Sequence, residues 1–316
     1  IIRVMQKISI VCACDDSYSQ HAMAMITSVF ENNKGNSIDV YILTDNFSDQ
    51  TQKYFDELSV LYNNKIQIVN IDISLLAHLP LGGKNYQGYI NLSTYYRLLI
   101  VKLFPTLDKI LYLDCDMIVR GNLSPLWNTN IENYAIAGIV DTWSKVQEGT
   151  FRLHYPKEQL YYNAGMGLYN LAFLRDFGFD NKVQNFVKEH YDWILLHDQD
   201  ILNAVLHGHF KEVSLEWNVM NNAIIRKCDI SPNQKKDFAK TLDSIKIIHY
   251  TGPLKPWHKE CYHPLKKDYW HYLNMSPMKG RHTVSRYESY KDKIHFLKCN
   301  WRAYLGMSSL SFIKIK

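Results

Sequence analysis

The fold is decided by residues 109–116, which read Lys109-Ile110-Leu111-Tyr112-Leu113-Asp114-Cys115-Asp116. The apolar part predicts a short buried strand, and two carboxylates follow it with one residue between them. Side chains alternate along a strand, so we expect Asp114 and Asp116 to project together from its carboxyl end, where open α/β sheets bind ligands. Two carboxylates this close repel each other unless a cation lies between them, and hard divalent cations prefer oxygen ligands.

Strands and helices alternate in the chain before this stretch. Ser48 is expected to cap a helix whose apolar face carries Tyr54, Phe55, Leu58, Leu61 and Tyr62. Another helix is predicted at 21–30, and apolar runs predict strands at 8–14, 38–43 and 66–71. This β-α-β-α-β order favours a parallel sheet of the nucleotide-binding type. Residues 15–18 read Asp-Asp-Ser-Tyr where a P-loop or a dinucleotide fingerprint needs glycines, which excludes both motifs.

The later chain continues the α/β pattern. We predict that Ser93 caps a helix that runs through Arg97 to Phe104. Further helices are predicted at 181–193 and 197–206, and further strands at 134–140, from 161, at 211–215 and at 244–250. The sequence therefore predicts an α/β fold in which a mixed, mainly parallel sheet is flanked by helices. We divide the chain into a catalytic domain, residues 1–275, and a helical tail, residues 276–316.

Composition restricts the class of protein. Of 316 residues, 47% are hydrophobic and 21% are charged, as in globular domains, and no apolar run approaches the roughly 18 residues of a membrane span. Six scattered cysteines favour reduced thiols over a disulfide framework. The amino terminus also lacks the pattern of a secretory signal. We therefore expect a cytoplasmic protein.

The tail is basic. Residues 279–316 hold nine Lys or Arg and two acidic residues, a net charge of +7, so the remainder of a chain whose net charge is +5 carries about −2. Aromatic residues are interspersed among the basic ones. A solvated amphipathic helix is the simple interpretation, and peripheral attachment to an anionic membrane at the inner face of the cell membrane is the functional one. Nucleic acid is not an expected partner, because no binding motif accompanies the charge.

Three further motifs follow the paired aspartates: Asn163-Ala164-Gly165, Asp198-Gln199-Asp200 and the segment 249–257, His-Tyr-Thr-Gly-Pro-Leu-Lys-Pro-Trp. Together, in this order and spacing, the four motifs resemble glycosyltransferase family 8 over about residues 7–275, most closely its bacterial lipooligosaccharide-type galactosyl- and glucosyltransferases. The resemblance implies a GT-A (Rossmann-like) fold, a UDP-hexose donor, Mn2+ and transfer with retention of anomeric configuration.

The resemblance implies which residues bind the diphosphate and the uridine of the donor. Asp114, Asp116 and His249 would hold Mn2+, with Mg2+ as the alternative, and Lys255 would reach the departing phosphate. Gly252 would let the backbone approach the diphosphate, and Cys115 would border the donor through its backbone. The positions that correspond to uridine contacts are Ala13, Asp15 and Ser17.

The hexose and acceptor residues are implied in the same way. Arg97, Asn163 and Ala164 would contact the donor sugar, and Asp198 with Gln199 would address its hydroxyls. Gln199 corresponds to the residue facing the anomeric carbon, and an amide is a poor nucleophile. We therefore favour a front-face reaction in which the leaving diphosphate helps to deprotonate the acceptor. Asp141, at a strand end, is the candidate acceptor contact.

Each residue also has a structural interpretation. His249 could be a hydrogen-bonded core histidine, Asp198 a helix cap and Arg97 an ion-pair partner. Asn163 could serve a turn, and Lys255 could be a solvated lysine.

The function predicted is metal-dependent, retaining transfer of galactose or glucose from a UDP-sugar to an oligosaccharide, lipid-linked or other glycan acceptor, in synthesis of lipopolysaccharide or another surface glycan. The alternatives are a nucleotidyltransferase or nucleotide-sugar hydrolase using the same metal–diphosphate site, and a non-catalytic sugar-binding protein.

Overall fold

The computed structural model describes residues 6–77, 79–80, 92–143, 148–156, 158–224, 238–261 and 263–287, together with 289, 291, 293, 294 and 297. Its strands are β1 (Lys7–Ala13), β2 (Ser37–Thr44), β3 (Lys65–Asn70), β4 (Lys109–Leu113), β5 (Met117–Val119), β6 (Ile136–Val140), β7 (Tyr162–Asn170), β8 (Phe210–Glu212), β9 (Val219–Met220) and β10 (Ile247–His249).

The helices connect and cover these strands. They are α1 (Ser19–Asn32), α2 (Asp49–Tyr62), α3 (Ile100–Leu103), α4 (Ser124–Trp127), α5 (Gly149–Arg152), α6 (Leu171–Asp176), α7 (Phe179–His190), α8 (His197–Leu206), α10 (Phe238–Asp243) and α11 (Lys266–Asn274). Short 3-10 helices lie at Asp16–Tyr18, Ile73–Leu76, Leu92–Leu99, Tyr191–Trp193, Leu215–Trp217 and Asn221–Ile224.

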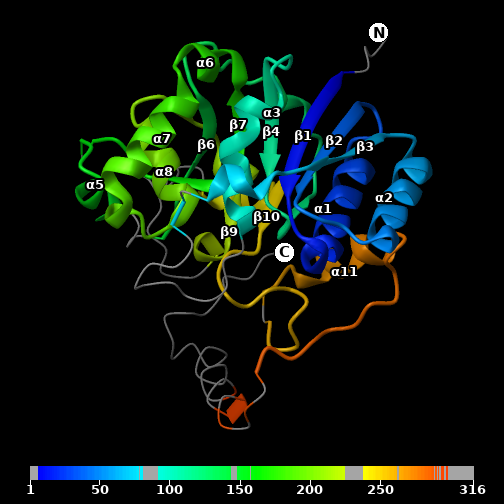
Figure 1. Ribbon diagram of the computed structural model, residues 1–316. Coiled ribbons are helices and arrows are strands. Elements are labelled where there is room, and N and C mark those ends of the chain that lie inside the picture. The colour runs from blue at the N-terminus through cyan, green and yellow to red at the C-terminus, as the bar shows by residue number, and fades with distance from the viewer. Residues whose placement is uncertain are drawn as a thin grey trace.

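The main sheet has seven strands in the order β3-β2-β1-β4-β7-β6-β8 (Figure 1). Strands β3, β2, β1 and β4 are parallel, β7 runs antiparallel to both of its neighbours, and β8 is parallel to β6. This confirms the predicted mixed, mainly parallel sheet. A second, three-stranded sheet has the order β5-β10-β9.

Apolar side chains on the two faces of the main sheet enter separate cores. In β1, Ile10 and Cys12 belong to the core shared with α1 and α2, while Val11 belongs to the opposite one. In β4, Leu111 lies on the first side and Tyr112 on the second. Continuous apolar runs suit such strands because both faces are buried. Figure 1 shows α1 and α2 beside β1–β3, and α6, α7 and α8 at the other end of the sheet.

The carboxyl ends of β1 and β4 meet where the strand order turns, since β1 continues to β2 on one side and pairs with β4 on the other. Ligands of open α/β sheets bind at such a switch point. The small sheet lies at the same edge. Its strand β10 pairs with β5 so that His249 lies opposite Met117, the residue after Asp116.

Several local predictions need correction. Leu61 is 61% exposed, because the apolar stripe of α2 is narrower than its sequence indicates; Phe55 and Leu58 are buried as expected. Ser93 is not a cap, since it lies inside the 3-10 helix Leu92–Leu99, and only Ile100–Leu103 of the predicted helix is α-helical. The strand expected at 211–215 ends at Glu212. Ser48 does cap α2, accepting a hydrogen bond from the Thr51 backbone N–H.

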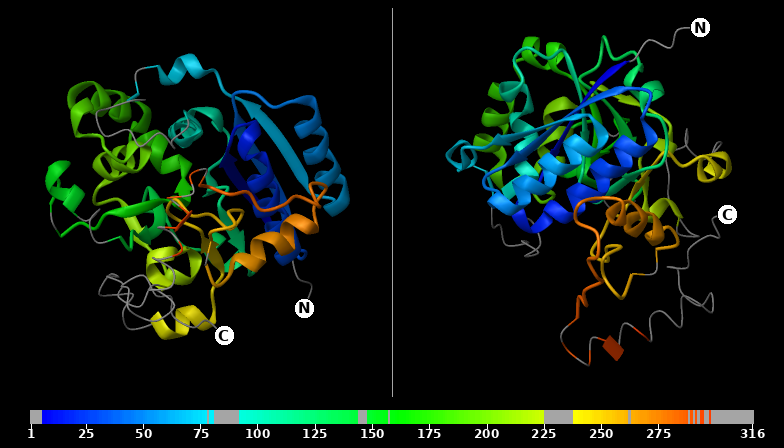
Figure 2. Two further views of the ribbon diagram at one scale, coloured as in Figure 1. Left: turned by 90° about the horizontal axis from the view of Figure 1, so that it is seen from below. Right: turned by 90° about the vertical axis from the view of Figure 1, so that its right-hand side faces the viewer.

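The carboxyl-terminal segment departs from the body after α11, which packs against α1 (Figure 2). Residues 276–287 form turns and one β-bridge, in which Val284 pairs with His258. Most of the predicted helical tail lies outside the described residues. Among the described helices, none combines the length and the apolar character that spanning a membrane requires.

Candidate active site

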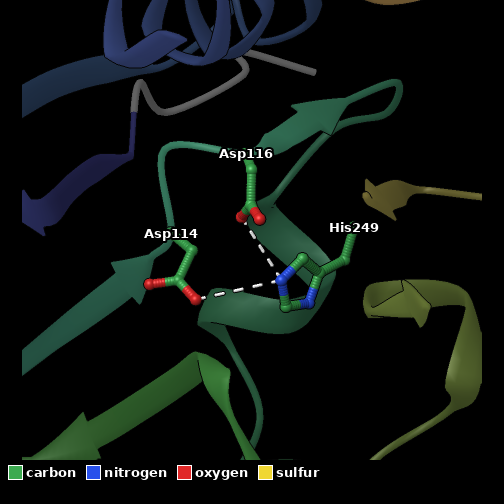
Figure 3. A group of neighbouring side chains, drawn as sticks. All are labelled: Asp114, Asp116 and His249. Atoms are coloured by element: carbon green, nitrogen blue, oxygen red, sulfur yellow. Dashed lines mark ion pairs between the residues drawn. The ribbon is translucent and has the colours of Figure 1, made fainter. Parts of the chain in front are cut away.

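Three potential metal ligands converge at the carboxyl edge of β4. His249 Nε2 lies 3.8 Å from Asp114 Oδ2 and 3.3 Å from Asp116 Oδ1, and the ligand atoms of the three residues all lie within 4.8 Å of one another. Figure 3 shows the imidazole of His249 presenting one nitrogen to both carboxylates. The predicted projection of Asp114 and Asp116 toward one point is therefore what the structure shows.

The chemistry of these atoms suits a divalent cation. Asp116 Oδ1 is buried and accepts no hydrogen bond from any residue that the structure describes. His249 Nδ1 lies 2.9 Å from Asn218 Oδ1, and when Nδ1 donates there, Nε2 presents a lone pair to Asp116 Oδ1. Two lone pairs at this distance repel each other unless a proton or a metal ion lies between them. Carboxylate oxygens with one imidazole nitrogen form a donor set that suits Mn2+.

A lysine supplies a second positive charge at the same point. Lys255 Nζ lies 2.5 Å from Asp116 Oδ2 and also donates to the Tyr250 carbonyl. Burial by itself would raise the pKa of Asp116, but the charge of the nearby Lys255 ammonium holds that pKa well below its ordinary value. Asp116 therefore stays ionised, and Lys255 is an ion-pair partner in the site, not a solvated side chain.

Two glycines permit the backbone to pass close to the site. A Cβ at Gly165 would lie 2.4 Å from His249 Cε1 and 2.8 Å from Asp114 Oδ2, so a larger residue would displace the metal ligands. Gly252 has a φ of +79°, a conformation that favours glycine, and no described residue would lie within 4 Å of a Cβ there. This leaves open the approach that the sequence predicts for a diphosphate.

Arg97 is a buried junction between two motifs. Its guanidinium lies 2.8 Å from Asp114 Oδ1 and 2.9 Å from Asp198 Oδ2, donates to the Ala164 carbonyl, and stacks over Tyr112 at 4.2 Å. Burial opposes its charge, yet the two carboxylates keep the pKa of Arg97 well above its ordinary value. Only 5% of the residue is exposed. The ion-pair interpretation is therefore what the structure displays, and contact with a donor sugar stays a prediction.

Side chains from three elements form a polar wall beside the metal ligands. Gln199 Oε1 accepts from the Ala164 backbone N–H at 2.9 Å, and its Nε2 donates to Asp141 Oδ2 at 3.2 Å. Asn163 Nδ2 donates to the same Asp141 oxygen at 2.9 Å. Asp198, the fifth residue of this region, is buried between Arg97 and the Thr94 hydroxyl, and burial raises its pKa. The structure thus brings Asp141, Asn163, Ala164 and Gln199 into one network.

The segment after β1 forms the other flank. Asp15 Oδ1 accepts from the Ser17 hydroxyl at 2.7 Å and from the Tyr18 backbone N–H at 2.9 Å. Cys115 is buried with its Sγ 3.4 Å from the Ala13 carbonyl, and hydrogen bonds with Cys12 and Cys14 lower the pKa of its thiol. The predicted uridine residues therefore lie next to the paired aspartates.

Three residues of the site escaped prediction. The ring of Tyr18 is 38% exposed and lies edge-on to Trp257 at 5.7 Å. An aromatic residue within the polar segment that follows the first predicted strand could have signalled it. Asn218 and Arg152, which bond to His249 and to Asp200, carry no sequence signal, because a single Asn or Arg far from any motif is indistinguishable from a surface residue. The loops around residues 78–91 and 141–160, from which we expect the acceptor pocket to be built, lie partly outside the described residues.

Comparison with known proteins agrees with this arrangement. General stress protein A of Bacillus subtilis is 26% identical over 271 residues, covering 84% of this chain and 92% of the relative. Lipopolysaccharide glucosyltransferase WaaO of Escherichia coli is 30% identical over 271 residues, covering 81% and 74%.

Among solved structures, galactosyltransferase LgtC in complex with donor and acceptor sugar analogues superposes with a TM-score of 0.77 at 25% identity, covering 90% of this chain and all of that one. The fold is therefore the GT-A type of LgtC. The sequence profile of glycosyl transferase family 8 matches residues 9–261, more than half of the chain. The protein belongs to glycosyltransferase family 8.

Proposed function

We propose that the protein transfers galactose or glucose from a UDP-hexose to a saccharide acceptor with retention of configuration and with the help of Mn2+. The observation that carries this proposal is the convergence of Asp114, Asp116 and His249 beside the Asn163–Gln199 wall. A donor diphosphate bound at the first group would place its sugar against the second.

Lys255 and Asp116 would assist cleavage of the bond between the sugar and the diphosphate. When bound, the metal ion would offset the negative charge that develops on the leaving diphosphate. Lys255, with its ammonium at Asp116, can turn to the same phosphate oxygens and add a positive charge. The Asp116 carboxylate, kept ionised by these partners, holds its position in the site.

The hydrogen bonds of Gln199 support the front-face route. Its oxygen accepts from the Ala164 N–H and its nitrogen donates to Asp141, so both ends of the amide are already engaged. An amide that is neutral and engaged in this way orients the sugar and does not attack it. The acceptor proton would then pass to the leaving diphosphate, and Asp141 would orient the acceptor hydroxyl.

The uridine would bind at the segment after β1, and the names of the relatives suggest the class of acceptor. The exposed ring of Tyr18 offers a stacking surface for a base, next to Asp15 and Ala13. Relatives named as lipopolysaccharide glucosyl- and galactosyltransferases favour a lipid-linked or oligosaccharide acceptor of a surface glycan. Such an acceptor suits a cytoplasmic enzyme whose basic tail, residues 279–316, attaches to an anionic membrane surface.

UDP release tests the proposal. Purified protein is incubated with UDP-glucose or UDP-galactose and Mn2+, with and without saccharide acceptors, and free UDP is measured. We expect acceptor-dependent release that EDTA abolishes. Release at the same rate without acceptor, or release of UMP together with hexose 1-phosphate, would instead support a hydrolase. Release of hexose 1-phosphate while the UMP group passes to an acceptor would support a nucleotidyl transfer. Metal-dependent UDP binding without any release would support the sugar-binding alternative.

A further inference from the structure

Asn218 lies between the metal ligands and the sugar wall. It is fully buried and follows the 3-10 helix Leu215–Trp217, directly before β9. Its Oδ1 is 2.9 Å from His249 Nδ1, and its Nδ2 donates to Asn163 Oδ1 at 2.9 Å. The strand that follows it, β9, is parallel to β10, the strand of His249, with Ile248 opposite Val219, so backbone pairing brings Asn218 close to His249. One amide therefore joins a metal ligand to a residue of the sugar wall.

The direction of these hydrogen bonds is fixed by groups that can act in only one way. A carboxylate oxygen such as Asp141 Oδ2 accepts hydrogen bonds, so the Asn163 atom facing it at 2.9 Å is the Nδ2 donor. The Gly165 backbone N–H only donates, so the Asn163 atom facing it at 3.0 Å is Oδ1. These two partners, on opposite ends of the Asn163 amide, agree on one orientation.

The same logic reaches His249. Because Asn163 presents Oδ1 to Asn218, the Asn218 atom on that side must be its Nδ2 donor. Its Oδ1 then faces His249 Nδ1, which must carry the ring proton. A reversed Asn218 would set two amide oxygens against each other in a buried place, which is costly. Nε2 is thereby left as the nitrogen that faces Asp114 and Asp116.

We propose that Asn218 is a positioning residue that fixes the tautomer and ring orientation of His249 for metal binding and couples the metal site to the donor-sugar wall. The metal part rests on the Asp114–Asp116–His249 group alone. The coupling part rests on the proposed function. Partners of this kind typically change metal affinity or activity by about 10–100-fold.

Two substitutions separate the effect of Asn218 on metal binding from its link to the donor-sugar wall. Asn218→Leu keeps the approximate size and removes both hydrogen bonds. Asn218→Asp keeps an acceptor for His249 Nδ1 but turns a second oxygen toward Asn163 Oδ1, which breaks the link to the sugar wall. Asn33→Leu is the matched control, since Asn33 is equally buried and bonds to the Val29 carbonyl and the Leu123 N–H in another part of the fold.

The measurements are Mn2+ binding to the nucleotide-free protein by electron paramagnetic resonance, and the tautomer of His249 by 15N nuclear magnetic resonance, its signals assigned by their loss in His249→Ala. We expect Asn218→Leu to weaken Mn2+ binding about tenfold or more and to lose the single Nδ1–H tautomer. Asn218→Asp should keep Mn2+ affinity within about threefold and keep the tautomer. Its KM for UDP-hexose should rise about tenfold, and Asn33→Leu should leave Mn2+ binding unchanged.

Wild-type Mn2+ affinity in Asn218→Leu, or an equal loss in Asn33→Leu, would overturn the proposal. Should Asn218→Leu fail to fold, Asn218→Asp decides, because a tenfold loss of Mn2+ affinity there contradicts the role of the acceptor. Wild-type protein that binds no Mn2+ also overturns it. Protein that binds Mn2+ with this pattern but never cleaves a UDP-hexose contradicts the proposed function instead.

Discussion

The chain contains two Asp-x-Asp triplets of identical spacing, at 114–116 and at 198–200, and the structure uses them in opposite ways. The first triplet follows strand β4, and its two side chains turn toward one point, where one oxygen of each faces His249 Nε2. The second lies in the first turn of α8, where residues two apart point to different sides. Asp198 meets Arg97, and Asp200 meets Arg152.

The two triplets differ in how many of their carboxylate oxygens are already bound by other groups of the protein. In the first triplet, Arg97 and Lys255 each take one oxygen, and the other oxygens remain directed at the metal position. In the second, Asp200 is fully buried and accepts from Arg152, from the Tyr161 hydroxyl and, as two further bonds, from the backbone N–H groups of residues 195 and 196. The same pattern therefore makes a ligand site on a strand end and a structural clamp on a helix.

The largest expected effect is the loss of activity on substitution of Asp116 in the first triplet. Asp116→Ala should reduce UDP-hexose turnover at least about 1,000-fold, because it removes a metal ligand and the partner of Lys255. The melting temperature should fall less than in Asp200→Ala, since Asp116 lies at the site and its removal breaks the single ion pair with Lys255. Turnover and thermal melting are measured on the same preparation. Full activity would remove Asp116 from the metal shell.

Asp200→Ala should do the reverse and act mainly on stability. Removing one partner leaves Arg152 and two backbone N–H groups without their acceptor, a loss of about 3–5 kcal/mol. The double variant Arg152→Met/Asp200→Leu should recover much of this loss, as hydrophobic replacements of buried ion pairs do. Urea unfolding measures both. An Asp200→Ala protein of wild-type stability would contradict the clamp.

Gly165→Ala tests whether the first triplet depends on free space. The added Cβ would press on His249 and Asp114, so Mn2+ affinity should fall about tenfold. Gly138→Ala is the control on the neighbouring strand β6, where a Cβ would make ordinary contacts at 3.7 Å. Calorimetric titration with Mn2+ compares them. Equal affinities in the two variants would show that the ligands can shift at no cost.

The smallest effect concerns acid stability in the absence of metal. The pKa of Asp116 is lowered on folding from 3.8, so this group contributes stability above that pH and loses it as the pH falls. Burial raises the pKa of Asp198, so its contribution changes in the opposite direction and improves on acidification. Between pH 5 and 3, stability should therefore decline less steeply than wild type in Asp116→Asn and more steeply in Asp198→Asn. Urea unfolding with EDTA at several pH values measures these slopes. Slopes of the two variants that differ from the wild-type slope in the same direction would contradict the assignment.

The sequence predicted the sheet and the convergence of Asp114, Asp116 and His249 because the motifs that carry them are encoded locally. Apolar runs such as 109–113 and a cap such as Ser48 follow from short-range preferences. Ser93 was predicted wrongly because a serine before a helical stretch resembles a cap whether or not the first turn is α-helical. Asn218 and Arg152 could not be predicted, because their roles come only from tertiary contacts with residues far away in the chain.

The pairing of β10 with β5 has a consequence for the order in which the protein is completed. His249 arrives 133 positions after Asp116, 249 minus 116, and comes from a separate small sheet. During synthesis the amino-terminal strands can pair long before that sheet exists. A nascent or truncated chain would thus carry both aspartates without their histidine. The group of three potential metal ligands is therefore complete only after most of the chain has been made.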